Sequence, residues 1–478
     1  MMVTLALVLS ACGGGSSQSP GAPARSTPSG TSGLPVDTGG PGTETSEPVE
    51  GVEPGASSEA VTGEPCGPDA AWVGLFGDGI ACIDSTGWKT YNETNSTIKS
   101  GQIHDVAFCN GTTWFATSGG LATADKNGWS SPEATGRIYP DAVACDPTGG
   151  IWVSGYDLAA HYDGTDLQTY ETSNLGSGQF AKTVNDVAVA PDGTAWFATS
   201  SGVASYDGKT WRHWEKGHGF KEEMFPERVA VDSKGRPWVS LATWGVITLV
   251  GDTWTQYKQD YLFQTKAVTV APDGKIWAGT YSKGVSSFDG KTWKTYTRGP
   301  KSLPSNSVKS LVVDKTGRVW VGTEWGLAVF DGGNWQTYHM SDSPLLDDEI
   351  FSLAVEGGGP KLPAKQPKAP GSLTGRIVTN GDPIAGRSVQ ACVEFVGSIY
   401  AGDTPCEDQA FFRTVKTGSD GTFTFTDLPV SKYALTFQNK DGKWMRLTDG
   451  YKVGDKESTV TENGTTDLGD LDVAQPSG

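Results

Sequence analysis

Short runs of alternating apolar and polar residues fill the middle of the chain, and their pattern repeats with a period of about 42 residues. Each copy carries an aliphatic residue, a turn of the form Asp/Pro-x-Gly and then a tryptophan. The tryptophans that mark the copies are Trp72, Trp114, Trp152, Trp196, Trp238, Trp277 and Trp320. A second tryptophan follows 15 or 16 residues later in every copy except the third, which has Leu167 there. Repeats of about 40 to 50 residues with four strand-sized runs are typical of a β-propeller.

The sixth copy shows the four expected strands most clearly, at 266–270, 276–279, 285–288 and 292–296. The turn Pro272-Asp273-Gly274 separates the first two strands, and Asp289-Gly290 separates the last two. Each Asp-Gly pair supplies the positive-φ residue that a tight hairpin needs. These turns are therefore interpreted as structural rather than calcium-binding.

The two ends of the repeat array complement each other. The first copy begins at Cys66-Gly67-Pro68-Asp69, the turn into its second strand, and no first strand precedes it. After the seventh copy, 349–355 reads as one extra first strand. We expect this run to complete the first blade, which closes the ring and removes both exposed sheet edges. The prediction is a seven-bladed β-propeller over 64–357.

The chain continues with a Pro/Lys linker at 358–370 and a second pattern of alternating strands at 371–478. Asn-Gly, Asp-Gly and Gly-Asp turns separate these strands, which favours a small β-sandwich. The fold class expected for the whole chain is all-β.

The N-terminus predicts export. Residues 1–12 form a short apolar stretch that ends at Cys12 and fits a secretory signal. Residues 13–63 are mostly Gly, Ser, Pro, Thr and Glu, so we expect a disordered tether.

Three segments resemble known families. Leu9-Ser10-Ala11-Cys12 resembles a bacterial lipobox, which implies cleavage before Cys12 and lipid attachment to it. The segments 303–338 (LPSNSVKSLVVDKTGRVWVGTEWGLAVFDGGNWQTY) and 184–211 (VNDVAVAPDGTAWFATSSGVASYDGKTW) resemble two-component regulator propeller repeats. That family implies an extracytoplasmic sensing propeller. The segment TGSDGTFTFTDLPVSKYALTFQNKDGKW resembles carboxypeptidase regulatory-like or prealbumin-like modules, which implies a non-catalytic stalk or spacer.

Composition and charge limit the possible partners. Lys and Arg number 37 against 55 Asp and Glu, a formal charge of −18, so counterion release cannot drive binding to nucleic acid. No apolar run reaches the roughly 18 residues that span a bilayer, so membrane attachment is expected through the lipid anchor only.

With Cys12 assigned to lipid, six cysteines remain, and an even number in an exported chain favours disulfides. Sequence alone leaves fifteen pairings open. Cys392 and Cys406 stand apart near the C-terminus, so we expect them to pair. For the other four we expect the pairs Cys66–Cys82 and Cys109–Cys145.

Large aromatic residues fall in the loop between the second and third strands of five copies. They are Phe76, Tyr156, Trp244, Tyr281 and Trp325. Lys283 occupies this loop in the copy between the two tryptophans, and Glu324 precedes Trp325. In a propeller these loops share one rim around the channel with the connections between blades, where His104 and His218 lie. The aromatic rim predicts stacking against sugar rings, peptide or another flat ligand. The alternative is packing against neighbouring loops.

The sequence contains no HExxH, GxSxG or GxxxxGK[ST] motif. We therefore expect a lipid-anchored, non-catalytic propeller on the extracytoplasmic face of a bacterial cell membrane, without metal or cofactor. Its partner would be a ligand, carbohydrate or peptide, or a surface protein.

Two other functions stay open. One is a metal-dependent lyase: streptogramin lyases share the seven-bladed architecture and Trp-rich units such as Trp196-Phe197, although their Ile-Gly-Arg unit ending is missing here. The other is a structural or adhesive role at the cell surface.

Replacing Cys12 with Ser should release the protein from the membrane fraction, because two or more acyl chains are what make anchoring stable. Membrane fractionation of cells that express the two forms measures this. A wild-type chain that is already soluble would contradict the anchor.

Overall fold

The repeat pattern folds into antiparallel sheets of four short strands joined by tight turns, and the predicted all-β fold is confirmed. The computed structural model describes residues 63–132, 138–176, 183–393, 406, 411–447, 452–453 and 456–473, all within one structural unit, 59–478. The predicted signal, Cys12 and the tether up to residue 62 lie outside the described residues. None of the helices in the described part of the chain is long and apolar enough to span a membrane.

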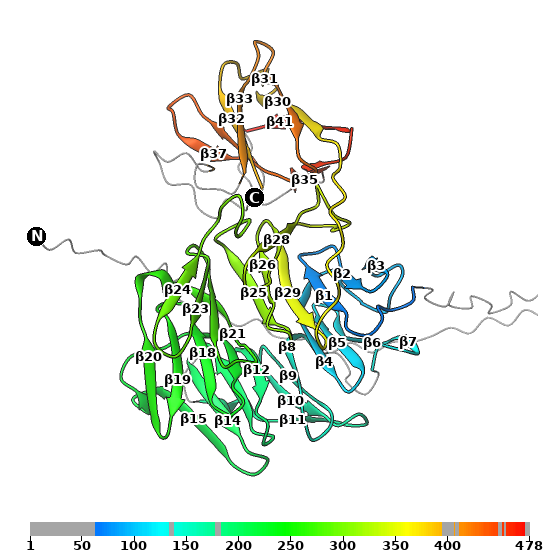
Figure 1. Ribbon diagram of the computed structural model, residues 1–478. Helices are drawn as coiled ribbons and strands as arrows, with labels where there is room; N and C mark the ends of the chain where they lie inside the picture. Colours follow the sequence, from blue (N-terminus) through cyan, green and yellow to red (C-terminus); the bar gives the residue numbers. More distant parts are fainter. Residues whose placement is uncertain are drawn as a thin grey trace, which may run out of the picture. The chain divides into compact units, whose positions relative to one another are not determined.

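Seven sheets are the blades of the propeller (Figure 1). Blade 1 consists of β29 (Ile350–Val355), β1 (Ala71–Leu75), β2 (Ile80–Asp84) and β3 (Gly87–Tyr91). Blade 2 consists of β4 (Ile103–Cys109), β5 (Thr112–Thr117), β6 (Gly120–Asp125) and β7 (Gly128–Ser130). Blade 3 consists of β8 (Pro140–Cys145), β9 (Ile151–Gly155), β10 (Leu158–Tyr162) and β11 (Leu167–Thr169). Blade 4 consists of β12 (Val184–Val189), β13 (Ala195–Thr199), β14 (Gly202–Tyr206), β15 (Trp211–Lys216) and a short fifth strand, β16 (Gly219–Phe220).

Blade 5 consists of β17 (Pro226–Val231), β18 (Pro237–Leu241), β19 (Val246–Val250) and β20 (Thr253–Tyr257). Blade 6 consists of β21 (Thr265–Val270), β22 (Ile276–Thr280), β23 (Val285–Phe288) and β24 (Trp293–Tyr296). Blade 7 consists of β25 (Val308–Val313), β26 (Val319–Thr323), β27 (Gly326–Phe330) and β28 (Trp335–Tyr338). Two single-turn 3-10 helices, η2 (Thr172–Leu175) and η3 (Asp260–Leu262), lie in connections between blades.

The ring is closed by a strand from the far end of the array. The surplus run expected at 349–355 is β29, which pairs antiparallel with β1 so that Trp72 faces Ala354 and Gly74 faces Ser352. The inner strands β29, β4, β8, β12, β17, β21 and β25 each pack against the next, and β25 packs against β29. The first blade is therefore built from both ends of the propeller sequence.

The repeated tryptophans fill the space between blades. Trp72 and Trp320 are 1% and 0% exposed, and of the other five only Trp114 is half-buried rather than buried. The Trp320 indole donates a hydrogen bond to Asp314 in the turn before β26, and Arg318 pairs with the same carboxylate at 2.7 Å. The Trp320 indole is thus hydrogen-bonded within its own blade, whereas the buried indole N–H groups of Trp152 and Trp196 have no partner among the described residues.

The C-terminal strands form a sandwich of two main sheets. One contains β31 (Asp382–Pro383), β30 (Gly371–Thr379), β34 (Thr422–Leu428) and β41 (Thr465–Asp472), and the other contains β33 (Phe412–Lys416), β32 (Ser388–Cys392), β36 (Ala434–Gln438) and β37 (Trp444–Arg446). Two small pairs complete it, β35 (Ser431–Lys432) with β40 (Thr459–Val460) and β38 (Lys452–Val453) with β39 (Lys456–Glu457). Apolar side chains such as Phe423, Phe425 and Leu435 form the core between the main sheets.

All three predicted disulfides are confirmed: Cys66–Cys82, Cys109–Cys145 and Cys392–Cys406. The first disulfide links the segment before β1 to β2 within blade 1, the second joins the ends of β4 and β8, and the third lies in the sandwich.

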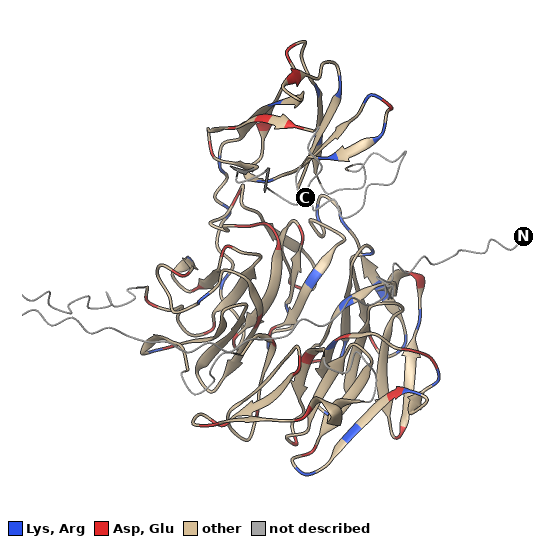
Figure 2. Ribbon diagram, turned by 180° about the vertical axis from the view of Figure 1, so that it is seen from behind, with Lys and Arg blue, Asp and Glu red and all other residues tan. Residues whose placement is uncertain are grey.

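Acidic and basic residues are interspersed over both parts of the fold, and residues of one sign do not gather on one part (Figure 2).

Replacing Ile350 with Ala should lower the free energy of unfolding by about 2–5 kcal/mol, because its side chain is fully buried in the cluster shared by blades 1 and 7. Val250→Ala is the matched control, since Val250 is 50% exposed and its loss should cost less than about 0.5 kcal/mol. Urea denaturation of both variants measures the difference. Equal unfolding midpoints would contradict the closure described here.

Candidate functional site

Every inner strand carries a β-bulge near its start. The register between the inner strand and its neighbour shifts by one residue in all seven blades. The residues at these bulges are His104, Asp141, Asn185, Glu227, Lys266, Lys309 and Phe351. A bulge re-aims the side chain of the extra residue, and such sites often border functional surfaces. Here the shift occurs at the same level of each blade, so the seven side chains converge.

These side chains surround the mouth of the central channel. A cavity of ≈ 360 Å³, here called the mouth cavity, is lined by His104, Asp141, Asn185, Glu227, Arg228 and Phe351. A narrower cavity of ≈ 120 Å³ continues between the inner strands, where Asp105, Asp186 and Lys309 are among its lining residues. The propeller therefore offers one polar opening that leads into its axis.

Ion pairs engage both lysines at the mouth. Lys266 Nζ lies 2.5 Å from Glu227 Oε1. His104 Nδ1 lies 3.0 Å from the carbonyl oxygen of Pro140 and 3.2 Å from Asp141 Oδ1. The Lys309 ammonium contacts Glu324 at 2.6 Å and Glu349 at 3.4 Å. The mouth thus displays hydrogen-bond donors, hydrogen-bond acceptors and side chains of both charge signs, without a large net charge.

Below the mouth, the half-buried Arg228 lies near two carboxyl groups, the buried Asp186 and the half-buried Asp105. Arg228 Nη1 lies 3.6 Å from Asp186 Oδ1, and the backbone N–H groups of Val143 and Val229 donate to Asp105 and Asp186 respectively. Burial raises the pKa of both carboxyl groups, that of Asp186 to about 7, because one guanidinium cannot offset the desolvation of two charges. One of the two carboxyl groups is therefore held partly protonated near neutral pH.

Exposed aromatic side chains surround this opening. Within the described part of the chain, the large aromatic residues that stay exposed are Phe76, Tyr139, Tyr156, Phe225 and Tyr281. Three lie in loops between the second and third strands, and two directly precede inner strands. Backbone contacts join the two kinds of loop, as in the bridges from Phe76 to Gln102 and from Tyr156 to Thr183. All five aromatic residues therefore lie on the face where the channel opens.

Three of the predicted aromatic residues lie on this rim. Phe76 is 42% exposed and stacks on Phe351 with ring centroids 4.8 Å apart, whereas Tyr156 is 70% exposed. Tyr281 is 41% exposed, and the Lys309 ammonium lies 5.7 Å from its ring centroid. Lys283 is exposed in the same loop as Tyr281, but Glu324 is buried and engaged by Lys309.

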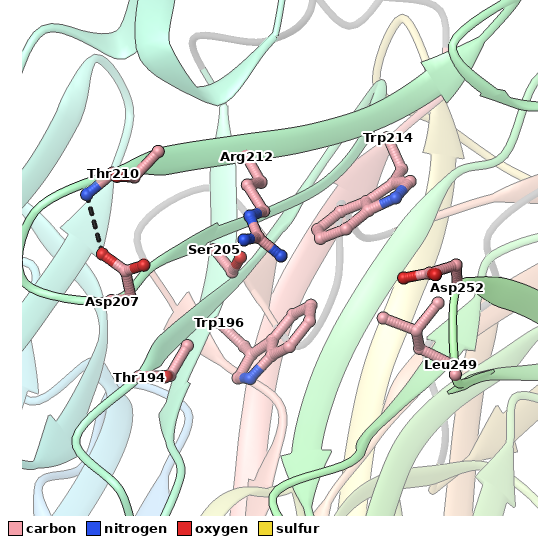
Figure 3. A pocket seen from close by; sticks show the side chains of 10 residues that line it. Thr194, Trp196, Ser205, Asp207, Thr210, Arg212, Trp214, Leu249 and Asp252 are labelled. Atoms are coloured by element: carbon pink, nitrogen blue, oxygen red, sulfur yellow. Dashed lines mark hydrogen bonds between the residues drawn. The ribbon is translucent and has the colours of Figure 1, made fainter.

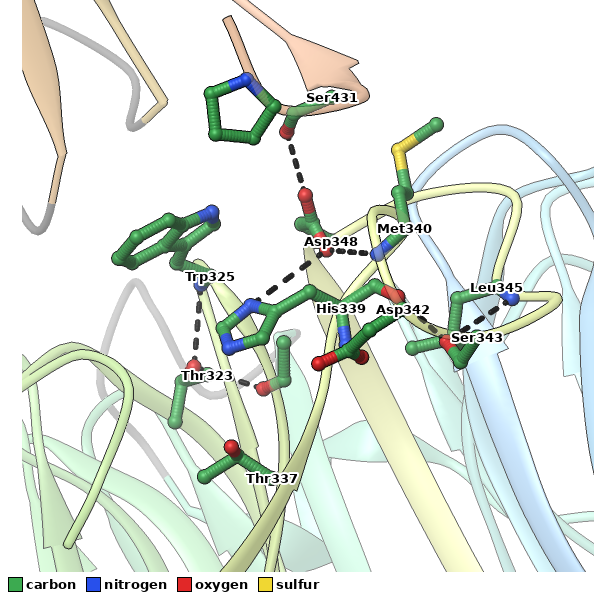
Figure 4. Close-up of polar contacts among 12 residues, drawn as sticks. Thr323, Trp325, Thr337, His339, Met340, Asp342, Ser343, Leu345, Asp348 and Ser431 are labelled. Carbon is green, nitrogen blue, oxygen red and sulfur yellow. Dashed lines mark hydrogen bonds and ion pairs between the residues drawn. The ribbon is translucent and has the colours of Figure 1, made fainter. Parts of the chain in front are cut away.

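The two predicted tryptophans pack against neighbouring residues instead. Trp244 is half-buried and contacts Phe263, with Lys258 Nζ 5.4 Å from its ring centroid. Trp325 is half-buried, and its ring lies next to His339 (Figure 4). On its other side it contacts Phe411 of the sandwich, with ring centroids 5.8 Å apart. These contacts correspond to the alternative considered for the loop aromatics, so the two indoles do not frame an open rim.

The contacts around Trp325 belong to the junction with the sandwich. Ser431 donates a hydrogen bond to the buried Asp348, whose other oxygen accepts from the backbone N–H of Met340 (Figure 4). Lys432 forms ion pairs with Asp78 and, at 3.0 Å, with Asp347. The connection from β34 to β36, which contains β35, is thus held against the loops of blades 1 and 7.

Sequence reasoning placed His104 on the rim but missed the other six bulge residues, together with Tyr139 and Phe225. A signal for them exists: the second residue of each inner strand is polar or aromatic, as in Ile103-His104-Asp105-Val106 and Val308-Lys309-Ser310-Leu311. Among the described residues, no three His, Cys, Asp or Glu side chains group as metal ligands.

Comparisons with known proteins found one family model and several solved structures that are similar to parts of the chain. Residues 302–325 match the two component regulator propeller family. None of the curated proteins matches the chain. Among solved structures, the extracellular domain of a putative hybrid two component system from B. thetaiotaomicron aligns at 16% identity over 54% of this chain and 36% of that chain, with a TM-score of 0.45. The chain thus spans little more than a third of that domain.

Two further structures are similar at the level of the fold. PorZ, a bacterial surface component of the type-IX secretion system of Porphyromonas gingivalis, aligns at 15% identity over 79% of this chain and 64% of that chain, with a TM-score of 0.44. Catalytically inactive virginiamycin B lyase from Staphylococcus aureus, with quinupristin, aligns at 13% identity over 53% and 92%, with a TM-score of 0.42.

Replacing Asp186 with Asn should flatten the pH dependence of stability. The folded chain binds the Asp186 proton more tightly than the unfolded chain, in which an Asp has a pKa of about 3.9. The free energy by which this tighter proton binding stabilises the fold is complete below about pH 4 and is lost as the pH rises through about 7. The wild type should therefore lose more free energy of unfolding than the variant between about pH 5 and 8 in urea titrations. Parallel pH profiles would contradict this.

Proposed function

We propose that this protein is a non-catalytic, extracytoplasmic binding propeller of the sensor type, and that the mouth cavity binds a carbohydrate. One observation supports the proposal: five of the seven bulge side chains line the mouth cavity, and the exposed aromatic side chains belong to loops next to the starts of the inner strands that carry these bulges. Monomeric proteins rarely leave a group of large aromatic rings in water without a binding role.

The rim suits a ligand with flat faces. Tyr156 is exposed and Phe76 is held against Phe351, so the Phe76 ring is placed before a ligand arrives. By analogy with aromatic stacking on nucleic-acid bases, each stacked ring contributes about 1–3 kcal/mol. Two or three such rings are enough for a binding constant in the micromolar to millimolar range.

The polar residues of the mouth suit hydroxyl groups. A sugar hydroxyl both donates and accepts, and the mouth presents carboxylates, an amide and a guanidinium within one cavity. Because Glu227, Lys266 and Lys309 already form ion pairs, a neutral ligand replaces water at the mouth without leaving a buried charge unpaired. The same pairing supports binding rather than acid–base catalysis.

The disulfides support an extracytoplasmic location, because such bonds persist in oxidising compartments. The predicted lipid anchor at Cys12 and the tether would hold the propeller at the outer side of the cell membrane. The repeat at 302–325 supports a sensing role, in which ligand occupancy is passed to a partner protein.

Replacing Phe76 and Tyr156 together with Ala should weaken carbohydrate binding at least tenfold, because both stacking faces are removed. The probes are a panel of soluble neutral and uronic-acid oligosaccharides, measured by isothermal titration calorimetry. The melting temperature should fall only slightly, since Tyr156 is 70% exposed and the loss of Phe76, which is 42% exposed, removes one stacking contact with Phe351. Met445→Ala is the matched control, an exposed side chain on the sandwich that should leave affinity unchanged.

Other results would overturn parts of the proposal. Saturable binding of peptides but not of oligosaccharides would reject the ligand class. Cleavage of a bound oligosaccharide, detected by mass spectrometry, would reject the non-catalytic role. Binding that the double variant leaves intact would place the site elsewhere.

A further inference from the structure

The chain binds two extended segments of its own backbone in the same way, on blades 7 and 1. On blade 7, Tyr338 Oη donates to the carbonyl of Pro363 at 2.6 Å, and Gln336 Nε2 donates to the same oxygen at 3.1 Å. On blade 1, Tyr91 Oη donates to the carbonyl of Glu64 at 2.6 Å, and Lys89 Nζ donates to that of Pro65 at 3.3 Å. Each bound segment contains proline and is held through its main chain.

The donors occupy equivalent positions of the repeat. Gln336 and Tyr338 follow Trp335 by one and three residues on β28, and Lys89 and Tyr91 follow Trp88 in the same way on β3. The outermost strand of these blades therefore presents a pair of donors, one long polar side chain and one aromatic, to an extended backbone.

Blade 4 carries an equivalent pair, and none of the described segments of the chain is bound to it. Arg212 and Trp214 follow Trp211 by one and three residues on β15, and they line a cavity of ≈ 320 Å³ between blades 4 and 5. In Figure 3 the Arg212 guanidinium lies beside the rings of Trp196 and Trp214, with Leu249 and Asp252 of blade 5 on the opposite side. Neither Arg212 nor Trp214 has a side-chain hydrogen-bond partner among the described residues.

An acceptor is also present at an equivalent position. Asp84 of blade 1 accepts a hydrogen bond from the backbone N–H of Gly67 in the bound segment, at 3.0 Å. Asp207 takes this position in blade 4, where its Oδ1 accepts from the N–H groups of Lys209 and Thr210. Asp207 Oδ2 accepts no hydrogen bond from the described residues, so the cavity offers an acceptor as well as donors.

The apolar contacts match as well. On blade 7, Leu362 packs against the core cluster that contains Tyr338. Between blades 4 and 5, the stacked rings of Trp196 and Trp214, with centroids 5.5 Å apart, and the side chain of Leu249 belong to one apolar cluster. The cavity therefore combines an apolar floor with main-chain donors and an acceptor.

We propose that the cavity between blades 4 and 5 binds an extended, proline-containing segment of a partner polypeptide, through the contacts that hold 63–67 and 358–363 on blades 1 and 7. Arg212 and Trp214 donate to a backbone carbonyl of the partner, Asp207 accepts a backbone N–H, and an aliphatic or proline side chain lies on the indoles. Thr194 and Thr210 place this site at the turns between first and second and between third and fourth strands. Antiparallel strands put those turns at the end opposite the mouth cavity, so both sites can be occupied together.

The test uses the chain's own bound segment as the probe. A fluorescein-labelled peptide of 358–366, GGPKLPAKQ, is titrated with the full chain, and fluorescence anisotropy is measured. We expect saturable binding that Arg212→Ala weakens about tenfold and that Trp214→Phe, which keeps the ring but removes the N–H, weakens about fivefold. The tethered copy at blade 7 does not exchange readily, because its effective concentration is high.

Lys126→Ala is the matched control. Lys126 is an exposed long polar residue in the turn between β6 and β7 of blade 2, where Trp129 is followed by Ser130 and Pro132 instead of a donor pair. This variant should change the affinity less than twofold. Arg212→Ala and Lys126→Ala should keep the melting temperature of the wild type, since both side chains are exposed, whereas Trp214→Phe should lower it slightly because a smaller ring packs against Trp196.

Photo-crosslinking of the wild-type chain maps the site independently of the variants. A benzophenone residue replaces the leucine of the probe, and crosslinked peptides are identified by mass spectrometry. Crosslinks within 194–214 or 249–252 support the proposal. Absence of saturable binding, an affinity that Arg212→Ala leaves unchanged, or crosslinks confined to other blades would overturn it.

Discussion

The pairing of β29 with β1 is the contact on which the rest of the propeller depends. It joins backbone segments from the two ends of the repeat array, and it turns an open row of seven sheets into a ring. Without it, β1 would present an unpaired edge and the inner strands of blades 7 and 2 would lose the strand between them. The mouth cavity exists because the ring places seven bulges at one level around a single axis.

The sequence was sufficient for the architecture because each blade is specified locally. A tryptophan at a fixed distance from an Asp/Pro-x-Gly turn defines a strand, its turn and the side chain that fills the gap to the next blade. The count of strands then required a closing strand from the far end. The disulfides were predictable because Cys392 and Cys406 stand alone and the other four cysteines lie in the first three repeats.

The site was predictable only in part, for two physical reasons. A bulge is a property of two paired strands, so His104 or Lys266 looks in the sequence like any polar residue at the start of a strand. Exposure of a loop aromatic depends on residues distant in the chain. Trp325 and Tyr156 occupy the same loop of their blades, yet Phe411 covers the first and nothing comparable covers the second. The Pro/Lys linker is a similar case, because the grooves that hold it are formed by side chains of blade 7.

Ring closure by the last strand also sets an order of events during folding. Blade 1 cannot be completed until residues near 355 have been synthesised and have paired with β1 at the start of the array. The two strands are far apart in the sequence, so their pairing carries a large loop-closure cost. Until then the strands of the first repeats remain exposed to wrong pairing. The two propeller disulfides lie in these repeats, within blade 1 and between blades 2 and 3. They restrain blades 1 to 3, the part of the ring that is synthesised long before the closing strand β29. Oxidation and folding are therefore coupled in this chain.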